Sequence, residues 1–143
     1  MNKVKIVYWI ATGLLCLGYL AGGAMYIFAH DMVAEMFPKL GYPVYLTYLL
    51  PIVKILGPVA ILSRYSLALS DLAYAGMFYH LLLAFSAHVT SGQPGWQPSV
   101  SMFIALLVSF FTQNAARKAQ SPYASRRFGT GLILLCFGEF RPM

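Results

Sequence analysis

The sequence has few charged residues and lacks the motifs of common enzyme classes. Only 10% of its 143 residues are charged, and Asp and Glu together number four. The two cysteines, Cys16 and Cys136, lie far apart and form no C-x-x-C pair, which excludes a redox motif and a disulfide framework. The chain has no G-x-S-x-G, no phosphate-binding glycine loop and no Cys/His pairing for nucleophilic catalysis. No reaction can therefore be assigned from motifs.

Apolar residues are abundant instead. They make up 59% of the chain, which is typical of an integral membrane protein. The net charge is +6, but the basic residues flank apolar runs and form no single stripe. This pattern fits lipid headgroups, and we predict a lipid bilayer rather than nucleic acid as the partner.

Four apolar segments are long enough to cross a bilayer, which takes about 20 helical residues. The first follows two lysines as a signal peptide would, but its apolar run exceeds the roughly 7–15 residues of a signal core, so we predict a retained helix. The sequence predicts an all-α, antiparallel bundle of four transmembrane helices in residues 1–118, followed by a cytoplasmic or interfacial tail, 119–143. The predicted spans cover about residues 6–28, 45–63, 69–89 and 99–116.

The basic residues predict the orientation. With four spans, the loops on one side hold Lys39 alone among the cations, whereas the other side holds at least seven. Cytoplasmic segments carry an excess of Lys and Arg, so we expect a multi-pass protein of the bacterial inner membrane with both termini cytoplasmic. The residues on the predicted cytoplasmic side are Lys3, Lys5, Arg64, Arg117, Lys118, Arg126 and Arg127.

Residues 29–42, AHDMVAEMFPKLGY, mix charged and apolar residues after the first span. This composition favours a short helix in the outer interface over a free loop. Within the spans, Gly18 and Gly22 form a G-x-x-x-G pattern that lets another backbone approach closely, either inside the bundle or across a dimer. Gly57 lies in the second span beside two prolines that loosen the helix near Lys54.

Lys54 is costly in the middle of an apolar span. A lysine at a helix centre costs about 2.5–3.5 kcal/mol, so we expect it to face the bundle interior. Its amine leans toward the outer side, which argues against Asp71 as its direct partner. His80 in the third span lies at a similar depth, so the two residues are expected to share a cavity. A lysine and a histidine in one cavity favour either a neutral histidine or a lysine that more readily loses its charge, because like charges repel and burial disfavours charge.

The other polar residues have structural alternatives. Asp71 follows Ser70, which is expected to cap the third span, and Tyr74 either bonds a polar neighbour or packs. His80 is either a satisfied core histidine or a ligand-binding residue, and His88 suits an interfacial position. The two histidines are separated by about 12 Å of helix rise, so they cannot share one haem or one metal ion. We predict no metal site, because His30 and its acidic neighbours lack a metal-ligand spacing.

Four stretches occur in order: FPKLGYPVYL before the second span, KILG within it, DLAYAG opening the third and SAHVTSG closing it. Over about residues 10–117 the chain resembles the DoxX-like family of small four-helix integral membrane proteins. Proteins in or distantly related to this family include a membrane subunit of a thiosulfate:quinone oxidoreductase, components of thiol and oxidative-stress systems, and an animal chaperone for receptor assembly. The resemblance implies a four-helix membrane bundle.

The resemblance also singles out particular positions. The family commonly has glutamate where this chain has Asp71 and tryptophan where it has Leu72, and residues 119–143 do not resemble it. The shorter carboxylate weakens any direct contact inferred for that position. The positions that match the family pattern are Lys54, Gly57, Asp71, Tyr74, Gly76 and His88.

Three functions compete. The first is a redox-associated subunit that binds a quinone or similar molecule, with Lys54, Tyr74 and His80 as hydrogen-bond donors, His88 as a further ligand-binding candidate, and no covalent cofactor. The second is a non-enzymatic assembly factor, partner subunit or homo-oligomer that uses the Gly18–Gly22 face. The third, a transporter or proton path, ranks last because it needs polar groups across the whole membrane.

Overall fold

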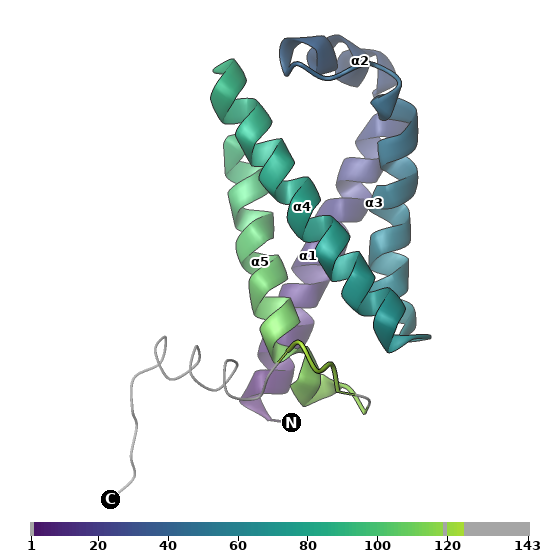
Figure 1. Ribbon diagram of the computed structural model, residues 1–143, viewed down its shortest axis with the longest axis vertical. Helices are drawn as coiled ribbons and strands as arrows, with labels where there is room; N and C mark the ends of the chain where they lie inside the picture. Colours follow the sequence, from purple (N-terminus) through teal and green to yellow (C-terminus); the bar gives the residue numbers. More distant parts are fainter. Residues whose placement is uncertain (1, 119, 125–143) are drawn as a thin grey trace, which may run out of the picture.

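The computed structural model describes residues 2–118 and 120–124. Within these residues the chain is helical, with five α-helices and no strand, which confirms the predicted fold class. Four long helices run alternately up and down, and a short one lies across one end of the bundle (Figure 1). In chain order the helices are α1 (Lys3–Phe28), α2 (His30–Lys39), α3 (Leu46–Ser63), α4 (Leu67–Ser91) and α5 (Trp96–Ala116).

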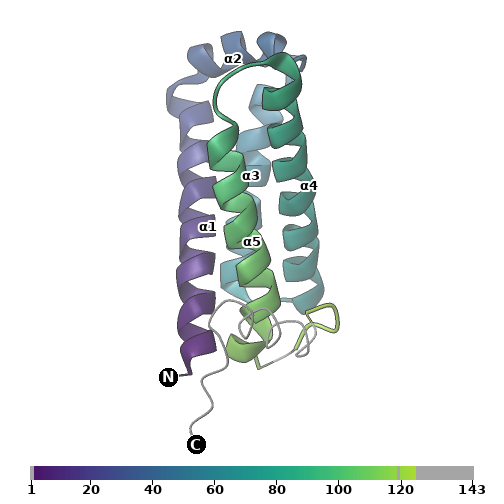
Figure 2. The same cartoon turned by 90° about the vertical axis from the view of Figure 1, so that its left-hand side faces the viewer.

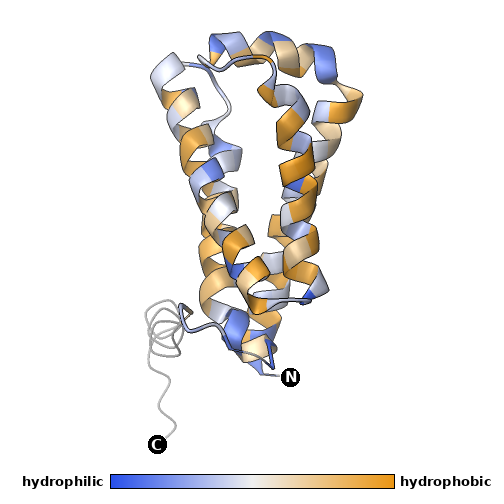
Figure 3. Cartoon of the chain, turned by 45° about the vertical axis from the view of Figure 1, so that its right-hand side comes forward, coloured by the Kyte–Doolittle hydropathy of each residue, from blue (hydrophilic) through white to orange (hydrophobic). Residues whose placement is uncertain are grey.

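The long helices α1, α3, α4 and α5 are each long and apolar enough to cross a membrane. Hydrophobic residues dominate their middle parts, and more hydrophilic residues collect at both ends of the bundle (Figure 3). α1 begins at Lys3 rather than near residue 6, and α5 begins at Trp96 rather than near residue 99. Polar end residues can be helical without entering hydrocarbon, so an apolar window underestimates helix length.

The four long helices form a ring in which α1 and α4 lie diagonally opposite each other. α1 packs on α3 and α5, and α4 packs on the same two helices (Figure 2). Many large apolar side chains outside the core face outward, as expected for contact with lipid. The buried core cluster consists of Leu15, Tyr19, Ile61, Tyr74, Met77, Leu81 and Leu106.

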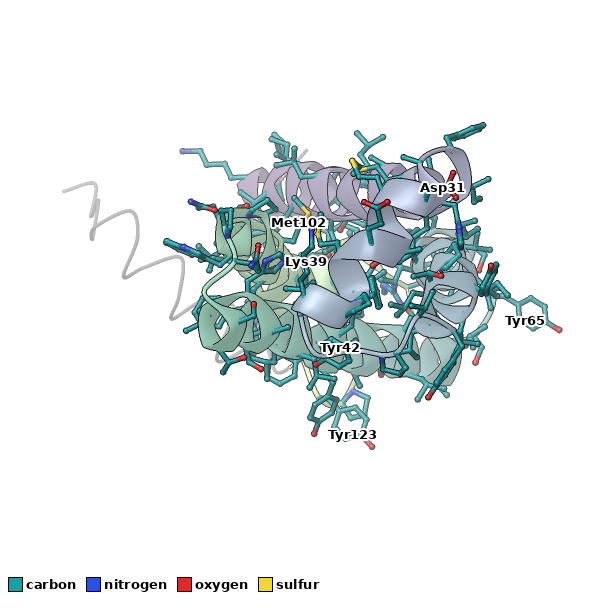
Figure 4. The ribbon with its side chains drawn as sticks, turned by 90° about the horizontal axis from the view of Figure 1, so that it is seen from above. Asp31, Lys39, Tyr42, Tyr65, Met102 and Tyr123 are labelled. Carbon is teal, nitrogen blue, oxygen red and sulfur yellow. The ribbon has the colours of Figure 1, made fainter. Side chains whose placement is uncertain are left out.

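α2 closes one end of the bundle, and we call this the α2 end. Viewed from that end, the short helix crosses over the ends of the long ones (Figure 4). Val33 and Phe37 bury its inner face, and the Phe37 ring packs edge-to-face on Tyr26 at 5.8 Å. Met32 is exposed on α2, and Phe28, just before it, is 88% exposed. This division of apolar residues confirms the short helix predicted after the first span and suits an interfacial position.

The opposite, N-terminal end holds the start of α4. The predicted cap at Ser70 is wrong: the N-cap is Ser66, whose hydroxyl oxygen accepts a hydrogen bond from the amide of Leu69. Ser66 precedes the helix in an extended conformation, which suits a cap, whereas Ser70 already lies inside the helix. The Ser70 hydroxyl instead accepts a hydrogen bond of 2.6 Å from Arg117.

The predicted tail lies mostly outside the described residues, namely at residues 119 and 125–143. Its described part, residues 120–124, is held by the side chain of Asn114. The Asn114 amide group donates to the carbonyl oxygens of Ser121 and Ala124, and its oxygen accepts from the Ser121 amide at 2.8 Å. These bonds fix the short segment against the C-terminal end of α5, at the N-terminal end of the bundle.

Candidate functional site

A pocket of about 190 Å³ lies between α3 and α4. Lys54 and His80 both line it, as expected from their similar depth. Tyr19 reaches it from α1 across the bundle. The remaining lining residues are Leu50, Val53, Leu56, Gly57, Leu69, Leu72, Ala73, Gly76 and Met77. Three residues with polar groups, Tyr19, Lys54 and His80, therefore line an otherwise apolar pocket.

The opening of this α3–α4 pocket faces the surface that lipid would cover. Leu56 and Leu72 are 59% and 68% exposed, whereas Tyr19 and Met77 are buried. The exposed side chains form the outer rim, and the buried ones form the inner wall. The pocket therefore opens on the outer face of the bundle between α3 and α4.

Lys54 directs its amine toward α1. The Lys54 Nζ atom lies 4.7 Å from the centre of the Tyr26 ring, a cation–π distance. Gly22 makes room for it, because a Cβ atom at residue 22 would lie 3.1 Å from Nζ. Tyr26 is near the α2 end of α1, so the amine points toward the N-terminal end of its own helix, as helix geometry predicts. The ring and the glycine allow the amine to remain inside the bundle.

His80 is held by Tyr19. The Tyr19 hydroxyl lies 3.1 Å from His80 Nδ1 and donates a hydrogen bond of 3.1 Å to the Met77 carbonyl oxygen. The two rings also pack edge-to-face with their centroids 5.6 Å apart. These contacts use one ring nitrogen of His80, and no described residue forms a hydrogen bond with the other, Nε2. That nitrogen is available to a molecule in the pocket.

The two pocket glycines differ in their surroundings, which gives a first prediction. A Cβ at Gly57 would lie 2.6 Å from Met77 Cε, whereas a Cβ at Gly76 would meet nothing within 4 Å. We expect Gly57→Ala to lower the free energy of unfolding by about 1 kcal/mol, because the buried Met77 must shift. Gly76→Ala is expected to be neutral or to stabilise by up to about 1 kcal/mol. Thermal unfolding of both variants in detergent tests this, and equal shifts would contradict it.

Tyr74 does not join Lys54 and His80 in the pocket. Its hydroxyl forms a 2.6 Å hydrogen bond with Ser109 of α5, and the Ser109 hydroxyl is also 2.6 Å from that of Thr12 in α1. All three residues are buried. This triad bridges three helices, and it gives Tyr74 the polar neighbour that was one of its two predicted alternatives.

Asp71 lies at the N-terminal end, away from Lys54. One carboxylate oxygen accepts a hydrogen bond of 2.9 Å from the Ser121 hydroxyl, and the other accepts one of 3.4 Å from Gln113. Arg117 nearby donates to Ser70 and to the Ile61 carbonyl oxygen. Asp71 thus ties α4 to α5 and to the segment that follows α5.

A larger groove of about 650 Å³ lies on the other side of α4, against α5. Its lining includes Asp71 and three tyrosines, one of which, Tyr123, projects outward from the bundle (Figure 4). Lys54 and His80 do not line it. The lining consists of Ala68, Asp71, Leu72, Tyr74, Ala75, Phe78, Tyr79, Leu106, Leu107, Phe110, Phe111 and Tyr123.

The structure places two further candidates away from the α3–α4 pocket. His88 is in the last turn of α4, and its ring lies where a Cβ at Gly95 would approach within 3.1 Å. Gly18 packs against Met102 of α5, which is labelled between α1 and α5 in Figure 4. Both glycines of the G-x-x-x-G pattern therefore face neighbouring helices of the same bundle: Gly18 faces α5 and Gly22 faces α3.

Sequence reasoning missed Tyr19, Thr12 and Ser109. Each is a hydroxyl-bearing residue inside an apolar span, and this is a weak pattern because such residues often pack or bond their own helix. Tyr19 follows Gly18 in the first span, and its position along the bundle is at a depth similar to that of Lys54 and His80. That depth was available from the sequence, but the direction of the side chain across the bundle was not.

Comparison with family models gives a match to the model described as the DoxX-like family over residues 10–111. The comparisons with curated proteins and with solved structures gave no match. The match covers α1 from residue 10 onward, all of α2, α3 and α4, and most of α5, and it includes every residue that lines the α3–α4 pocket.

Proposed function

The chain belongs to the DoxX-like family, and on this premise we propose that it is a redox-associated membrane subunit that binds a quinone-type molecule between α3 and α4. One observation carries the proposal: Lys54 and His80, from two neighbouring helices, line the same pocket. Apolar pockets with a few convergent polar groups are the usual form of small-molecule sites. Family membership and four apolar helices support a multi-pass membrane protein.

The size of the pocket supports a head-and-tail ligand. Small-molecule pockets typically enclose about 300–1,000 Å³, and this one encloses about 190 Å³. It suits a single ring rather than a whole lipid-like molecule. A ring bound between Lys54 and His80 would leave its apolar tail at the exposed rim formed by Leu56 and Leu72, in contact with acyl chains.

The polar residues suit the oxygens of such a ring. The Lys54 amine donates hydrogen bonds and His80 offers Nε2, so each can bind one oxygen substituent. Tyr19 holds His80 in place from α1. We omit Tyr74 from this ligand set, because its hydroxyl bonds Ser109 and it lines the other groove.

The proposal is tested by looking for a retained quinone. We expect protein purified in mild detergent to yield a quinone on lipid extraction, detected by chromatography, and to gain thermal stability when a short-chain benzoquinone is added. A membrane protein of similar size from the same preparation, carried through the same steps, controls for quinone that co-purifies with lipid. The proposal fails if extracted quinone does not exceed this control and the benzoquinone leaves the melting temperature unchanged.

The alternative function, a non-enzymatic assembly factor or homo-oligomer, has less support. It depends on the Gly18–Gly22 face as a contact surface, and this face packs against Met102 and Lys54 of the same chain. Crosslinking in native membranes tests it, since a dedicated partner subunit would be recovered with the chain.

We also propose that the N-terminal end of the bundle lies on the cytoplasmic side of a bacterial inner membrane. Arg64 and Arg117 lie at that end, close to Lys3 and Lys5. Arg64 packs over the Trp9 ring at 4.8 Å and donates to the Ala116 carbonyl oxygen, so its charge stays at the helix ends. This distribution follows the positive-inside rule. Labelling of cysteines introduced at each end with an impermeant reagent tests the orientation.

A further inference from the structure

The Tyr19 hydroxyl has two polar neighbours and one proton to share between them. It lies 3.1 Å from the Met77 carbonyl oxygen and 3.1 Å from His80 Nδ1. A carbonyl oxygen can only accept, whereas an imidazole nitrogen donates or accepts according to its tautomer. The carbonyl oxygen therefore determines to which neighbour the Tyr19 hydroxyl donates its hydrogen bond.

The hydroxyl must donate to Met77. If it donated to His80 Nδ1 instead, lone pairs of the phenol and of the carbonyl would face each other at 3.1 Å in a buried site. Two lone pairs held against each other in a buried, low-dielectric site repel, so this arrangement is disfavoured. Because the phenol proton goes to Met77, the phenol oxygen accepts from His80, and Nδ1 must carry a hydrogen. The surrounding hydrogen bonds thus assign the tautomer.

This tautomer determines what His80 offers to the pocket. Lys54 lines the same pocket, and a second positive charge beside it is disfavoured, so the imidazole is neutral and carries one N–H. That N–H is at Nδ1 and points to Tyr19. The other nitrogen, Nε2, then presents a lone pair, and it accepts a hydrogen bond rather than donating one.

We propose that the α3–α4 pocket selects a hydroxyl group over a carbonyl group at His80, so that it binds the reduced, quinol form of its ligand in preference to the quinone. Tyr19 is the positioning residue that sets this preference. The inference rests on the proposed function and deepens it by naming the chemical form of the ligand. The Lys54 amine donates a hydrogen bond to the oxygen at the other end of the ring. This oxygen can accept a hydrogen bond in both the quinol and the quinone.

Binding of three related probes tests the inference. The probes are a short-chain ubiquinol kept reduced under anaerobic conditions, the matching ubiquinone, and the dimethyl ether of the quinol, which keeps both oxygens but has no O–H. We expect the quinol to bind about 3- to 10-fold more tightly than the quinone, the effect of one hydrogen bond. The ether is expected to bind no better than the quinone.

Tyr19→Phe is the informative variant, because it removes the hydroxyl and keeps the ring. Without the phenol oxygen, Nδ1 no longer has to donate and the imidazole can adopt the other tautomer. We expect the ratio of quinol to quinone affinity to fall to about one. Nitrogen-15 NMR of His80 gives a readout independent of ligand: a protonated Nδ1 in the original protein and a protonated Nε2 gaining population in the variant. A merely structural role for Tyr19 would change the melting temperature without changing this ratio.

The possible failures are distinguishable. If neither ubiquinol nor ubiquinone binds, the proposed function falls, and the inference falls with it. If both bind and the quinone binds equally or more tightly, or if NMR shows a hydrogen on Nε2 in the original protein, the preference for the hydroxyl form is wrong and the proposed function remains.

Discussion

Replacement of Lys54 by methionine is expected to weaken quinone and quinol binding by about 10- to 150-fold while the fold is kept. A hydrogen bond from a charged group contributes about 1.5–3 kcal/mol, which corresponds to this range. Methionine has a similar length and is apolar, so it fills the same space against Tyr26 and Gly22. The measurement is the dissociation constant of a short-chain ubiquinol, together with the melting temperature of the variant.

The stability of the Lys54 variant is expected to stay equal or to rise. The amine makes its cation–π contact with Tyr26, and in the described part of the chain it forms no ion pair, so its removal leaves no carboxylate without a partner. A lysine at a helix centre also costs about 2.5–3.5 kcal/mol of insertion energy, which methionine avoids. Lys39→Met on the exposed face of α2 is the matched control, with unchanged binding. A Lys54→Met protein that binds the ligand normally would make this lysine structural.

Ser109→Ala is expected to lower the free energy of unfolding by about 1–3 kcal/mol. The Ser109 hydroxyl bonds both Thr12 and Tyr74, each at 2.6 Å, so its loss leaves two buried hydroxyls without this partner. Single interhelical hydrogen bonds in membrane proteins contribute about 0.6 kcal/mol on average and up to about 1.7. The upper part of the expected range requires that the hydrogen bonds of Ser109 to Thr12 and to Tyr74 both contribute to the stability of the fold. Reversible unfolding in mixed detergents measures the effect.

The control for Ser109→Ala is Ser101→Ala in the same helix. The Ser101 hydroxyl is exposed and donates to the Gln97 carbonyl oxygen of its own helix, so its loss breaks no contact between helices. Tyr74→Phe removes one of the two bonds of Ser109, and the double variant measures their coupling. Equal effects of Ser109→Ala and Ser101→Ala would show that the buried triad adds nothing to the stability of the bundle.

Several features follow from particular residues of the sequence. The four apolar runs fix the spanning helices, because only a helix satisfies its backbone polar groups within hydrocarbon. The charged and apolar mixture of AHDMVAEMFPKLGY predicts α2, which buries Val33 and Phe37. Counting residues from the inner ends of two antiparallel spans puts Lys54 and His80 at one depth, and both line the α3–α4 pocket.

The boundaries of α4 show where local patterns mislead. The prediction placed the cap at Ser70, directly before Asp71, and did not consider Ser66. The structure uses Ser66, because α4 begins at Leu67, and the Ser70 hydroxyl inside the helix accepts a hydrogen bond from Arg117, the residue that follows α5. A distant residue thus determines the role of a local motif.

The sequence by itself determined the membrane class, the family, the number of helices and the depth of each polar residue along its span. Hydropathy and helical rise depend only on the order of residues within one span, so no contact between helices is needed to obtain them. The tertiary structure alone decided which polar residues meet. Tyr74 and His80 are six residues apart on α4, and at 3.6 residues per turn they point about 120° apart. Packing turns Tyr74 toward Ser109 and His80 toward Tyr19. The rotation of each helix about its axis depends on side chains from the other helices, and no single span contains that information.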